Sequence, residues 1–394
     1  MPSVEVAGPD LGDKLAGLDT ALVPLNARRR ALEQYLSTGS GRQKTSRFWR
    51  IDLETLAPGN DATFSFEQPR IENPNPRAIA LDLPAATRDC SDLLAQAFRT
   101  TSASQTKFGA LATAFAGAGA FVFVPADAAC DEPIVITYSI PKNAAVFPYT
   151  CVLLERGARA TIIERLEGGD GSFVCGIAEA VLGDHAELTY ANHQTLAEDA
   201  RVISTRVARP GRDARFSWAS AELGAELSVG DLEVAIEQPG IDANVTALFF
   251  PRGTQHVDIV STVDHVSGDA RSQTLVKSAA VDRGQARYLG NIRIAPHAQG
   301  SDASLRDDAL LLSKHAHIDS IPALEIAAND VKAYHGATVG ALEEEQIFYM
   351  ETRGIERTAA ERMIALGFFE PAIDRFPSES LRELLRTEVR AKFS

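Results

Sequence analysis

Short runs of β-prone residues follow one another through the middle of the chain. In residues 231–237, Asp-Leu-Glu-Val-Ala-Ile-Glu, charged and apolar positions alternate. This alternation predicts a strand with one face toward a core and the other toward water. Similar runs are found at 152–154, 161–163, 188–190, 202–207, 216–218, 232–236, 245–250, 257–263, 274–276, 288–294 and 310–312. The middle of the chain is therefore expected to be built mainly from strands.

A recurring motif separates many of these runs: a glycine followed within three residues by alanine. Gly183-Asp184-His185-Ala186 is one copy, and the others begin at Gly157, Gly211, Gly240, Gly268, Gly284 and Gly300. Glycine would supply a backbone turn with positive φ, and alanine a small inward side chain at a corner. The last three copies, which begin at Gly268, Gly284 and Gly300, are evenly spaced. Units this short must stack to bury a core, which predicts a β-solenoid or, failing that, a long antiparallel meander.

The two ends of the chain have a different periodicity. Residues 1–149 mix helical stripes with short strands such as 121–124, so we expect a mixed helical and α/β region there. Residues 150–342 would form the β core. The pattern of residues 343–394 predicts three short amphipathic helices, including one that starts with a capping box at Thr358-Ala359-Ala360-Glu361. They predict a helical domain that caps the solenoid, docks a partner, or does both.

Charge and cysteine content narrow the class of protein. The chain has 394 residues and a net charge of −14, so it lacks the positive field that gathers nucleic acid. Its four cysteines, Cys90, Cys130, Cys151 and Cys175, form no C-x-x-C pair and are too scattered for a disulfide framework. Neither an apolar leader nor a membrane-spanning run of about 18 residues is found. We therefore expect a cytoplasmic protein.

Common catalytic and nucleotide-binding motifs are missing. The segment 39–45, Gly-Ser-Gly-Arg-Gln-Lys-Thr, has Gln43 where a phosphate loop needs glycine. No nucleotide is therefore expected to bind this chain. His315 and His317 are two residues apart and would share a strand face, so they could hold a metal together or be two ordinary surface histidines. No third ligand lies next to them in the sequence.

One segment resembles a known family. Residues 322–340, Pro-Ala-Leu-Glu-Ile-Ala-Ala-Asn-Asp-Val-Lys-Ala-Tyr-His-Gly-Ala-Thr-Val-Gly, are similar to the signature of the SufB/SufD family of iron–sulfur cluster assembly scaffolds. The resemblance continues through residues 343–350 and 353–355, upstream through residues 307–313, and loosely at Arg47-Phe48-Trp49-Arg50. Within the family the chain looks like the SufD branch, because its last cysteine is Cys175 and the SufB branch carries a cluster-ligating cysteine late in its β-helix.

The resemblance implies a fold and a function. The fold is mainly β: a right-handed β-helix flanked by an N-terminal α/β region and a C-terminal α-helical domain. The implied function is that of a non-catalytic scaffold subunit, which pairs with a SufB-like paralogue and with the ABC-type ATPase SufC. A nascent iron–sulfur cluster, transient and shared with SufB, would be built at the subunit interface and then transferred.

The resemblance also implies site residues. His335 is the expected cluster ligand at the SufB interface, although it could instead be a turn residue that packs the last coil against the helices. Many SufD-like chains have a cysteine two positions earlier, where this chain has Ala333. The residues expected to dock the ATPase share the C-terminal helical region: Phe348, Tyr349, Arg353, Gly354, Met363 and Phe368. Two alternatives stay open: a β-helix enzyme that acts on carbohydrate, and a homodimeric reserve form of the scaffold.

Overall fold

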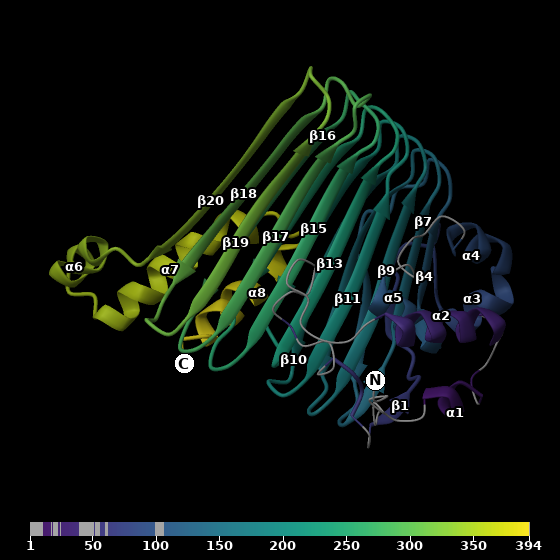
Figure 1. Cartoon of the computed structure of the whole chain (residues 1–394), viewed down its shortest axis with the longest axis horizontal. Helices are drawn as coiled ribbons and strands as arrows, with labels where there is room; N and C mark the ends of the chain where they lie inside the picture. The colour runs from purple at the N-terminus through teal and green to yellow at the C-terminus, as the bar shows by residue number, and fades with distance from the viewer. Residues whose placement is uncertain are drawn as a thin grey trace, which may run out of the picture.

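The strands of the chain stack into a long two-sheet solenoid in the computed structural model (Figure 1). The structure describes residues 11–16, 18, 23, 25–38, 51, 56–59, 62–98 and 106–393. Trp49 and the segment 39–45, both considered above, lie outside the described residues. The strands of one sheet are, in spatial order, β2 (Arg70–Glu72), β5 (Ile134–Ile140), β8 (Arg159–Gly168), β10 (Glu187–Leu196), β12 (Arg215–Glu222), β14 (Asp242–Phe249), β16 (Arg271–Ala280), β18 (Asp302–Leu311) and β20 (Lys332–Ala341).

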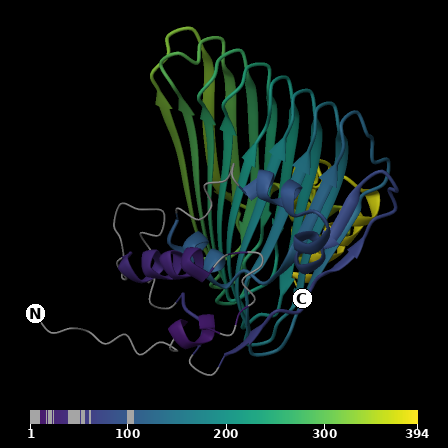
Figure 2. The ribbon, with the colours of Figure 1, turned by 90° about the vertical axis from the view of Figure 1, so that its right-hand side faces the viewer.

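The second sheet faces the first across the solenoid interior (Figure 2). Its strands are, in spatial order, β19 (His317–Ile326), β17 (Gln285–Ile294), β15 (His256–His265), β13 (Leu227–Ile236), β11 (Arg201–Arg209), β9 (Phe173–Leu182), β7 (Pro148–Leu154), β4 (Ala118–Val124) and β3 (Ile79–Asp82), with β1 (Thr63–Ser65) and β6 (Ala144–Val146) beside this path. Among the described strands, only the pairs β2–β5 and β3–β4 are antiparallel.

Consecutive strands from β7 onward alternate between the two sheets, so two strands make one turn. Glu187 lies midway in sequence between its two partners, Arg159 and Arg215, so these neighbouring turns have the same length. The last turns are slightly longer, since the step from Arg271 to its partner Asp302 exceeds the step from Arg159 to Glu187. The even spacing of the last three motifs therefore corresponds to about half a turn, and each motif marks a corner. The predicted solenoid is confirmed, and the antiparallel meander is wrong because the ladders are parallel.

The alanines of the corner motif have the predicted role, but several of the glycines do not. Ala158, Ala186 and Ala214 are completely buried at the corners. Gly157, Gly240 and Gly300 adopt positive φ, as expected. At other corners the residue with positive φ is an aspartate or a histidine: Asp127, His185, Asp213, Asp269 and Asp282. Short polar side chains tolerate this conformation, so a corner does not require glycine for its φ.

Close packing between turns explains the glycines that lack positive φ. A Cβ on Gly183 would lie 2.6 Å from the backbone nitrogen of Arg156, one turn earlier. A Cβ on Gly211 would lie 2.8 Å from the backbone nitrogen of Asp184. Real Cβ atoms do not approach backbone atoms this closely. These glycines are therefore required because adjacent turns lie in contact at the corner.

The N-terminal region is mixed α/β, as predicted. Its helices are α1 (Leu11–Ala16), α2 (Leu25–Ser37), α3 (Leu83–Asp89), α4 (Ser91–Phe98) and α5 (Lys107–Phe115). Helix α5 packs on β9 and β11, and α2 packs on α5. The parallel ladder extends into this region, because β4 and β5 pair with β7 and β8. No helix in the part of the chain that the structure describes has the length and apolar character to cross a membrane.

The C-terminal region consists of α6 (Glu344–Thr352), α7 (Arg357–Ile373) and α8 (Glu379–Ala391). Gly354 ends α6 with φ +82°, and Ser378 caps α8 by accepting a hydrogen bond from the backbone N–H of Leu381. The capping box predicted at Thr358 is wrong, because α7 already begins at Arg357 and Thr358 lies inside its first turn. Glu356 is the N-cap residue instead, and the Arg357 guanidinium contacts Glu344 and Glu361.

Candidate functional site

The solenoid ends at its last turn in two strands with open edges. Among the described residues, no strand pairs with the outer edge of β19 or of β20. Each of these strands therefore presents backbone N–H and C=O groups that a further strand could bind. Apolar side chains lie exposed on the same two strands, namely Ile326, Tyr334 and Val339. An open sheet edge with exposed apolar residues is typical of an interaction surface.

His335 lies on the open edge strand β20, in register with Leu305 of β18. Leu305 is completely buried in the interior of the solenoid, and residues in register on parallel strands share a face. The imidazole of His335 is therefore on the interior face of the last turn, where the interior opens to solvent. The residue as a whole is half-buried, but its Nδ1 atom is buried and has no hydrogen-bond partner within the described part of the chain.

Asp307 lies on the same interior face, one strand deeper than His335. It follows Leu305 by two residues on β18, and its side chain is 1% exposed. Its Oδ2 atom accepts a hydrogen bond from the Ser320 hydroxyl on β19, across the interior. Its Oδ1 atom is buried and without a partner among the described residues. Burial raises the pKa of Asp307 to about 6, the Ser320 hydrogen bond opposes this shift, and the neighbouring Asp308 adds to it.

The other candidate metal ligands are not brought together. His315 lies in the turn before β19, so it does not share a strand face with His317. His317 instead places its Nε2 atom 3.1 Å from Asp319 Oδ1. Within the residues described, no group of three or more His, Cys, Asp or Glu side chains is arranged to hold a metal ion. The metal-binding alternative for the His315–His317 pair is therefore not supported.

The cysteines lie far from the open end. Cys151 on β7 and Cys175 on β9 are buried, and all four cysteines are free. Burial raises the pKa of both thiols well above the usual range, which disfavours the reactive thiolate. Ala333 occupies β20 two residues before His335 and packs against the terminal core. On β20, His335 is therefore the side chain with a metal-binding nitrogen, and no thiol lies beside it.

The two tryptophans give no support to a sugar-binding face. Trp218 is buried in the solenoid interior, where its indole stacks on Tyr190 with ring centroids 4.4 Å apart. Its Nε1 donates a hydrogen bond to Asn192 Oδ1. Aromatic platforms that bind sugars have to face solvent, and Trp49 lies outside the described residues.

The C-terminal helices divide into an exposed part and a docked part. Helix α6 projects from the end of the solenoid beyond β20 (Figure 1), where Phe348 and Tyr349 are 66% and 59% exposed. Met363 in the first half of α7 is 55% exposed. Arg353 lies beside Tyr349 and donates a hydrogen bond to its hydroxyl group. We refer to these exposed residues of α6, of the turn after it and of α7 together as the α6–α7 patch: Phe348, Tyr349, Arg353 and Met363.

Phe368 lies apart from the α6–α7 patch. It packs against the apolar cluster between α7, α8 and the first sheet, and the Lys277 ammonium lies 4.4 Å from the centre of its ring. Phe250 and Phe369 lie in the same cluster, with ring centroids 5.6 Å apart. The second half of α7 is therefore fixed to the outer face of β14 and β16.

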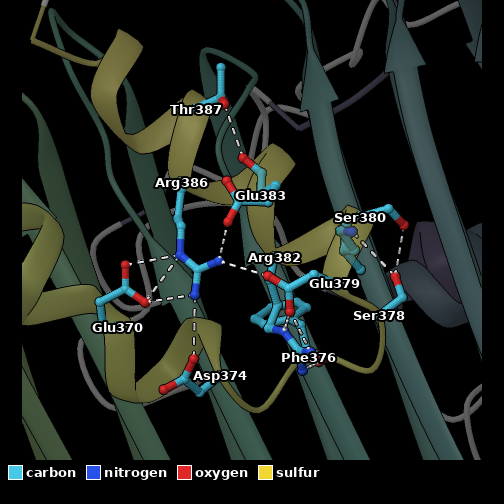
Figure 3. A network of polar contacts seen from close by, with 11 residues as sticks. Glu370, Asp374, Phe376, Ser378, Glu379, Ser380, Arg382, Glu383, Arg386 and Thr387 are labelled. Atoms are coloured by element: carbon cyan, nitrogen blue, oxygen red, sulfur yellow. Dashed lines mark hydrogen bonds and ion pairs between the residues drawn. The ribbon is translucent and has the colours of Figure 1, made fainter.

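Arg386 of α8 connects α8 to α7 (Figure 3). Its guanidinium donates hydrogen bonds to the Glu370 carboxylate at 3.0 Å and to Glu383 at 2.6 Å. Asp374 and Glu379 are within 3.5 Å of the same group. A planar guanidinium with several carboxylates fixes the relative orientation of two helices better than a single ion pair does.

Comparison with known proteins identifies the family. Residues 137–368 match the model of the SUF system FeS cluster assembly, SufBD core domain. This match covers more than half of the chain. The chain belongs to the SufBD family. It is 26% identical over 322 residues to the iron–sulfur cluster assembly protein SufD of Bacillus subtilis, which covers 80% of this chain and 74% of that protein.

Further SufBD family proteins from staphylococci are similar. The one from Staphylococcus saprophyticus is 26% identical over 313 residues, which covers 78% of this chain and 67% of the relative. The one from Staphylococcus aureus strain MRSA252 is 25% identical over the same length. The predicted membership of the SufB/SufD family of iron–sulfur cluster assembly proteins is therefore confirmed, and with it the mainly β fold.

Sequence reasoning located His335 but not its surroundings in this SufBD protein. Asp307 and Ser320 lie on different strands, and only the register of the last turns brings them together. Alternation along β18, where Ala303, Leu305 and Asp307 share the interior face, was the available signal for an inward-facing carboxylate.

Proposed function

We propose that this SufBD protein is a non-catalytic, cytoplasmic scaffold subunit that pairs with a SufB-like paralogue and with the ATPase SufC. In this proposal a nascent iron–sulfur cluster forms between the open end of the solenoid and the paralogue, and is then passed on. The observation that supports it best is the position of His335, on an unpaired strand at the open end of the interior. Iron accepts imidazole nitrogen as a ligand, as in the Rieske clusters.

A cluster that must be transferred is best held by a small number of ligands from each subunit. Strand β20 contains one imidazole, that of His335, and no thiolate, because Ala333 stands where many SufD-like chains have cysteine. The remaining ligands would come from the paralogue or from sulfide. A site completed by two subunits can release its cluster when the subunits move apart, whereas four cysteines of one chain would hold it more firmly.

The α6–α7 patch is the proposed docking surface for SufC, with Gly354 ending α6 beside it. Because α7 continues from this patch into the docked half at Phe368, a force applied to the patch would reach the sheet that ends in β20. ATP binding by SufC would then bias the solenoid pair between a closed and an open interface. This is a two-state switch driven by the partner's nucleotide.

Co-purification tests the two contacts separately. The chain is expressed together with its SufB-like and SufC partners, with Phe348, Tyr349 and Met363 changed together to Ser in one variant. We expect this variant to lose SufC and to retain the SufB-like subunit. Val339→Lys at the open edge should lose the SufB-like subunit and retain SufC. Leu36→Ser is the control, because Leu36 is 64% exposed at the opposite end of the chain. Retention of both partners by both variants would contradict the proposal.

The open edge also favours the homodimeric form as a second candidate. An edge that pairs with a paralogue can pair with a second copy of the same chain. Size-exclusion chromatography of the isolated protein distinguishes the two forms. We expect a dimer that Val339→Lys dissociates and that the SufB-like subunit replaces.

A further inference from the structure

Two buried polar atoms on the interior face of the last turns have no hydrogen-bond partner among the residues that the structure describes. One is Nδ1 of His335 and the other is Oδ1 of Asp307. A buried polar group that makes no hydrogen bond destabilises a protein by about 1–3 kcal/mol, so two of them close together call for an explanation. Their chemistry is complementary, since an imidazole N–H donates and a carboxylate oxygen accepts.

The strand register brings the two side chains within reach of one another. His335 on β20 is in register with Leu305 on β18, and Asp307 is two residues further along the same strand. Diagonal neighbours of this kind on adjacent strands are about 7–8 Å apart at their Cα atoms. Both side chains extend into the same interior, and no direct hydrogen bond joins Nδ1 to Oδ1 in this structure. A rotation of the imidazole at the open edge, or one shared water, would complete the contact.

The rest of the Asp307 environment fixes its orientation. Its second oxygen is held by the Ser320 hydroxyl on the opposite sheet, which leaves Oδ1 as the oxygen available to His335. Ala337 is the β20 residue in register with Asp307, and its small side chain leaves this oxygen room on the side of β20. Charged neighbours on β18 do not compete, because Asp308 faces the outer side of the sheet and pairs with Lys277.

We propose that Asp307 is a positioning residue for His335: its free carboxylate oxygen accepts a hydrogen bond from Nδ1–H, directly or through one water. The imidazole is then held in the Nδ1–H tautomer, and its Nε2 lone pair is presented at the open end of the solenoid. Histidines that bind metals commonly donate their second N–H to a carboxylate in this way. The role of Nε2 in holding a cluster rests on the proposed function, whereas the tautomer does not.

The tautomer can be measured in the full-length protein without any metal. The protein is labelled with ¹⁵N-histidine, and long-range proton–nitrogen correlation spectra at neutral pH report which ring nitrogen is protonated. The His335 signals are assigned by their loss in His335→Gln. We expect the Nδ1–H form in the unmodified protein, in contrast to the Nε2–H form that free imidazole side chains favour. A predominantly Nε2–H signal from His335 would overturn the proposal, whatever the variants do.

Three variants separate positioning from general stability. Asp307→Leu removes the acceptor and should shift His335 to the Nε2–H form, whereas Asp307→Asn keeps an acceptor oxygen and should preserve the Nδ1–H form. Asp302→Asn is the matched control, because it removes an exposed carboxylate from the same strand. An unchanged tautomer in a folded Asp307→Leu protein would also overturn the proposal.

Iron retention in the complex with the SufB-like and SufC partners is the second readout. Loss of a carboxylate that orients a ligating histidine typically weakens metal binding 10–100-fold, so Asp307→Leu should lower iron retention by about tenfold and Asp307→Asn should restore most of it. A tautomer shift with unchanged iron retention would support the positioning role of Asp307 and count against His335 as a cluster ligand. The two proposals can therefore fail independently.

Discussion

His193 of β10 and Glu388 of α8 are far apart in the chain, yet the Nε2 atom of His193 lies 2.7 Å from Glu388 Oε2. The His193 side chain is 4% exposed, so this contact is shielded from water. At the end of α8, Lys392 contacts Gln255 and Arg252 contacts the Ala391 carbonyl group. The terminal helix is therefore attached by polar contacts to β10 and to the turn between β14 and β15, as well as by its apolar face.

We predict that His193→Leu loosens α8 locally. The substitution leaves the Glu388 carboxylate without its buried partner, which should cost about 1–3 kcal/mol. Hydrogen–deuterium exchange should show faster exchange of the α8 amides, with little change in the strands β16 and β18. The control is Arg390→Gln, which changes an exposed side chain of the same helix outside the Arg386 network. Unchanged protection of α8 in the His193→Leu protein would mean that the apolar face alone holds the helix.

Arg386 (Figure 3) and Arg357 should control different parts of the helical region. Arg386→Ala removes the donor shared by the carboxylates of α7 and α8, so peptides from α8 should exchange faster. Arg357→Ala removes the contacts with Glu344, so peptides from α6 should exchange faster instead. Hydrogen–deuterium exchange measures the effect of both variants on the three helices. Faster exchange of all three helices in either variant would contradict this division.

Glycines of the solenoid should tolerate alanine only where a Cβ has space. Gly183→Ala places a Cβ against the backbone of the preceding turn, which should destabilise the protein by about 3 kcal/mol or more. Gly340→Ala on β20 has no atom within 4 Å of the added Cβ, so its effect should stay within about 0.5 kcal/mol. Thermal unfolding of the two variants measures the difference. Equal unfolding temperatures would show that the turns can move apart at the corner.

His265 should make stability depend on pH in the acidic range. Burial lowers the pKa of His265 from 6.5 to about 4, and its Nε2 atom lies 2.8 Å from the Ser272 hydroxyl. Between these values the unfolded chain binds a proton at His265 that the folded chain does not, so the free energy of unfolding falls as the pH decreases from 6.5 to 4. The loss is at most about 3 kcal/mol.

Denaturant unfolding at several pH values tests this prediction. His265→Gln should flatten the decrease between pH 6.5 and 4, even if it lowers stability at every pH. The control is His297→Gln, because His297 is exposed in a turn. An equally steep decrease in the His265→Gln protein would assign the pH dependence to other groups.

The solenoid could be predicted from the sequence because its corners impose a local requirement. Alanine has to fit the inside of each corner, as at Ala186, and this produces a repeat that is visible along the chain. The residue with positive φ could not be assigned in the same way, because aspartates such as Asp213 and Asp269 also adopt this conformation. The start of α7 was also mispredicted, since Glu356 is its N-cap residue and Thr358 lies inside its first turn.

The candidate site was less accessible to sequence reasoning. The family resemblance pointed to His335, but its burial depends on the register between β18 and β20. The proposed partner of its Nδ1 atom, Asp307, lies one full turn earlier in the chain and comes near only once the turns are stacked. Likewise, nothing in the spacing of Met363 and Phe368 reveals that the first is exposed and the second lies against Lys277.

The role of His335 as a cluster ligand is best tested by the iron and sulfide content of the complex assembled with the SufB-like and SufC partners. His335→Ala is compared with the unmodified chain and with His315→Ala, which removes an exposed turn histidine. We predict that His335→Ala leaves the complex assembled but greatly reduces its iron, its sulfide and its visible absorption, while His315→Ala does not. Full cluster content in the His335→Ala complex would contradict this role.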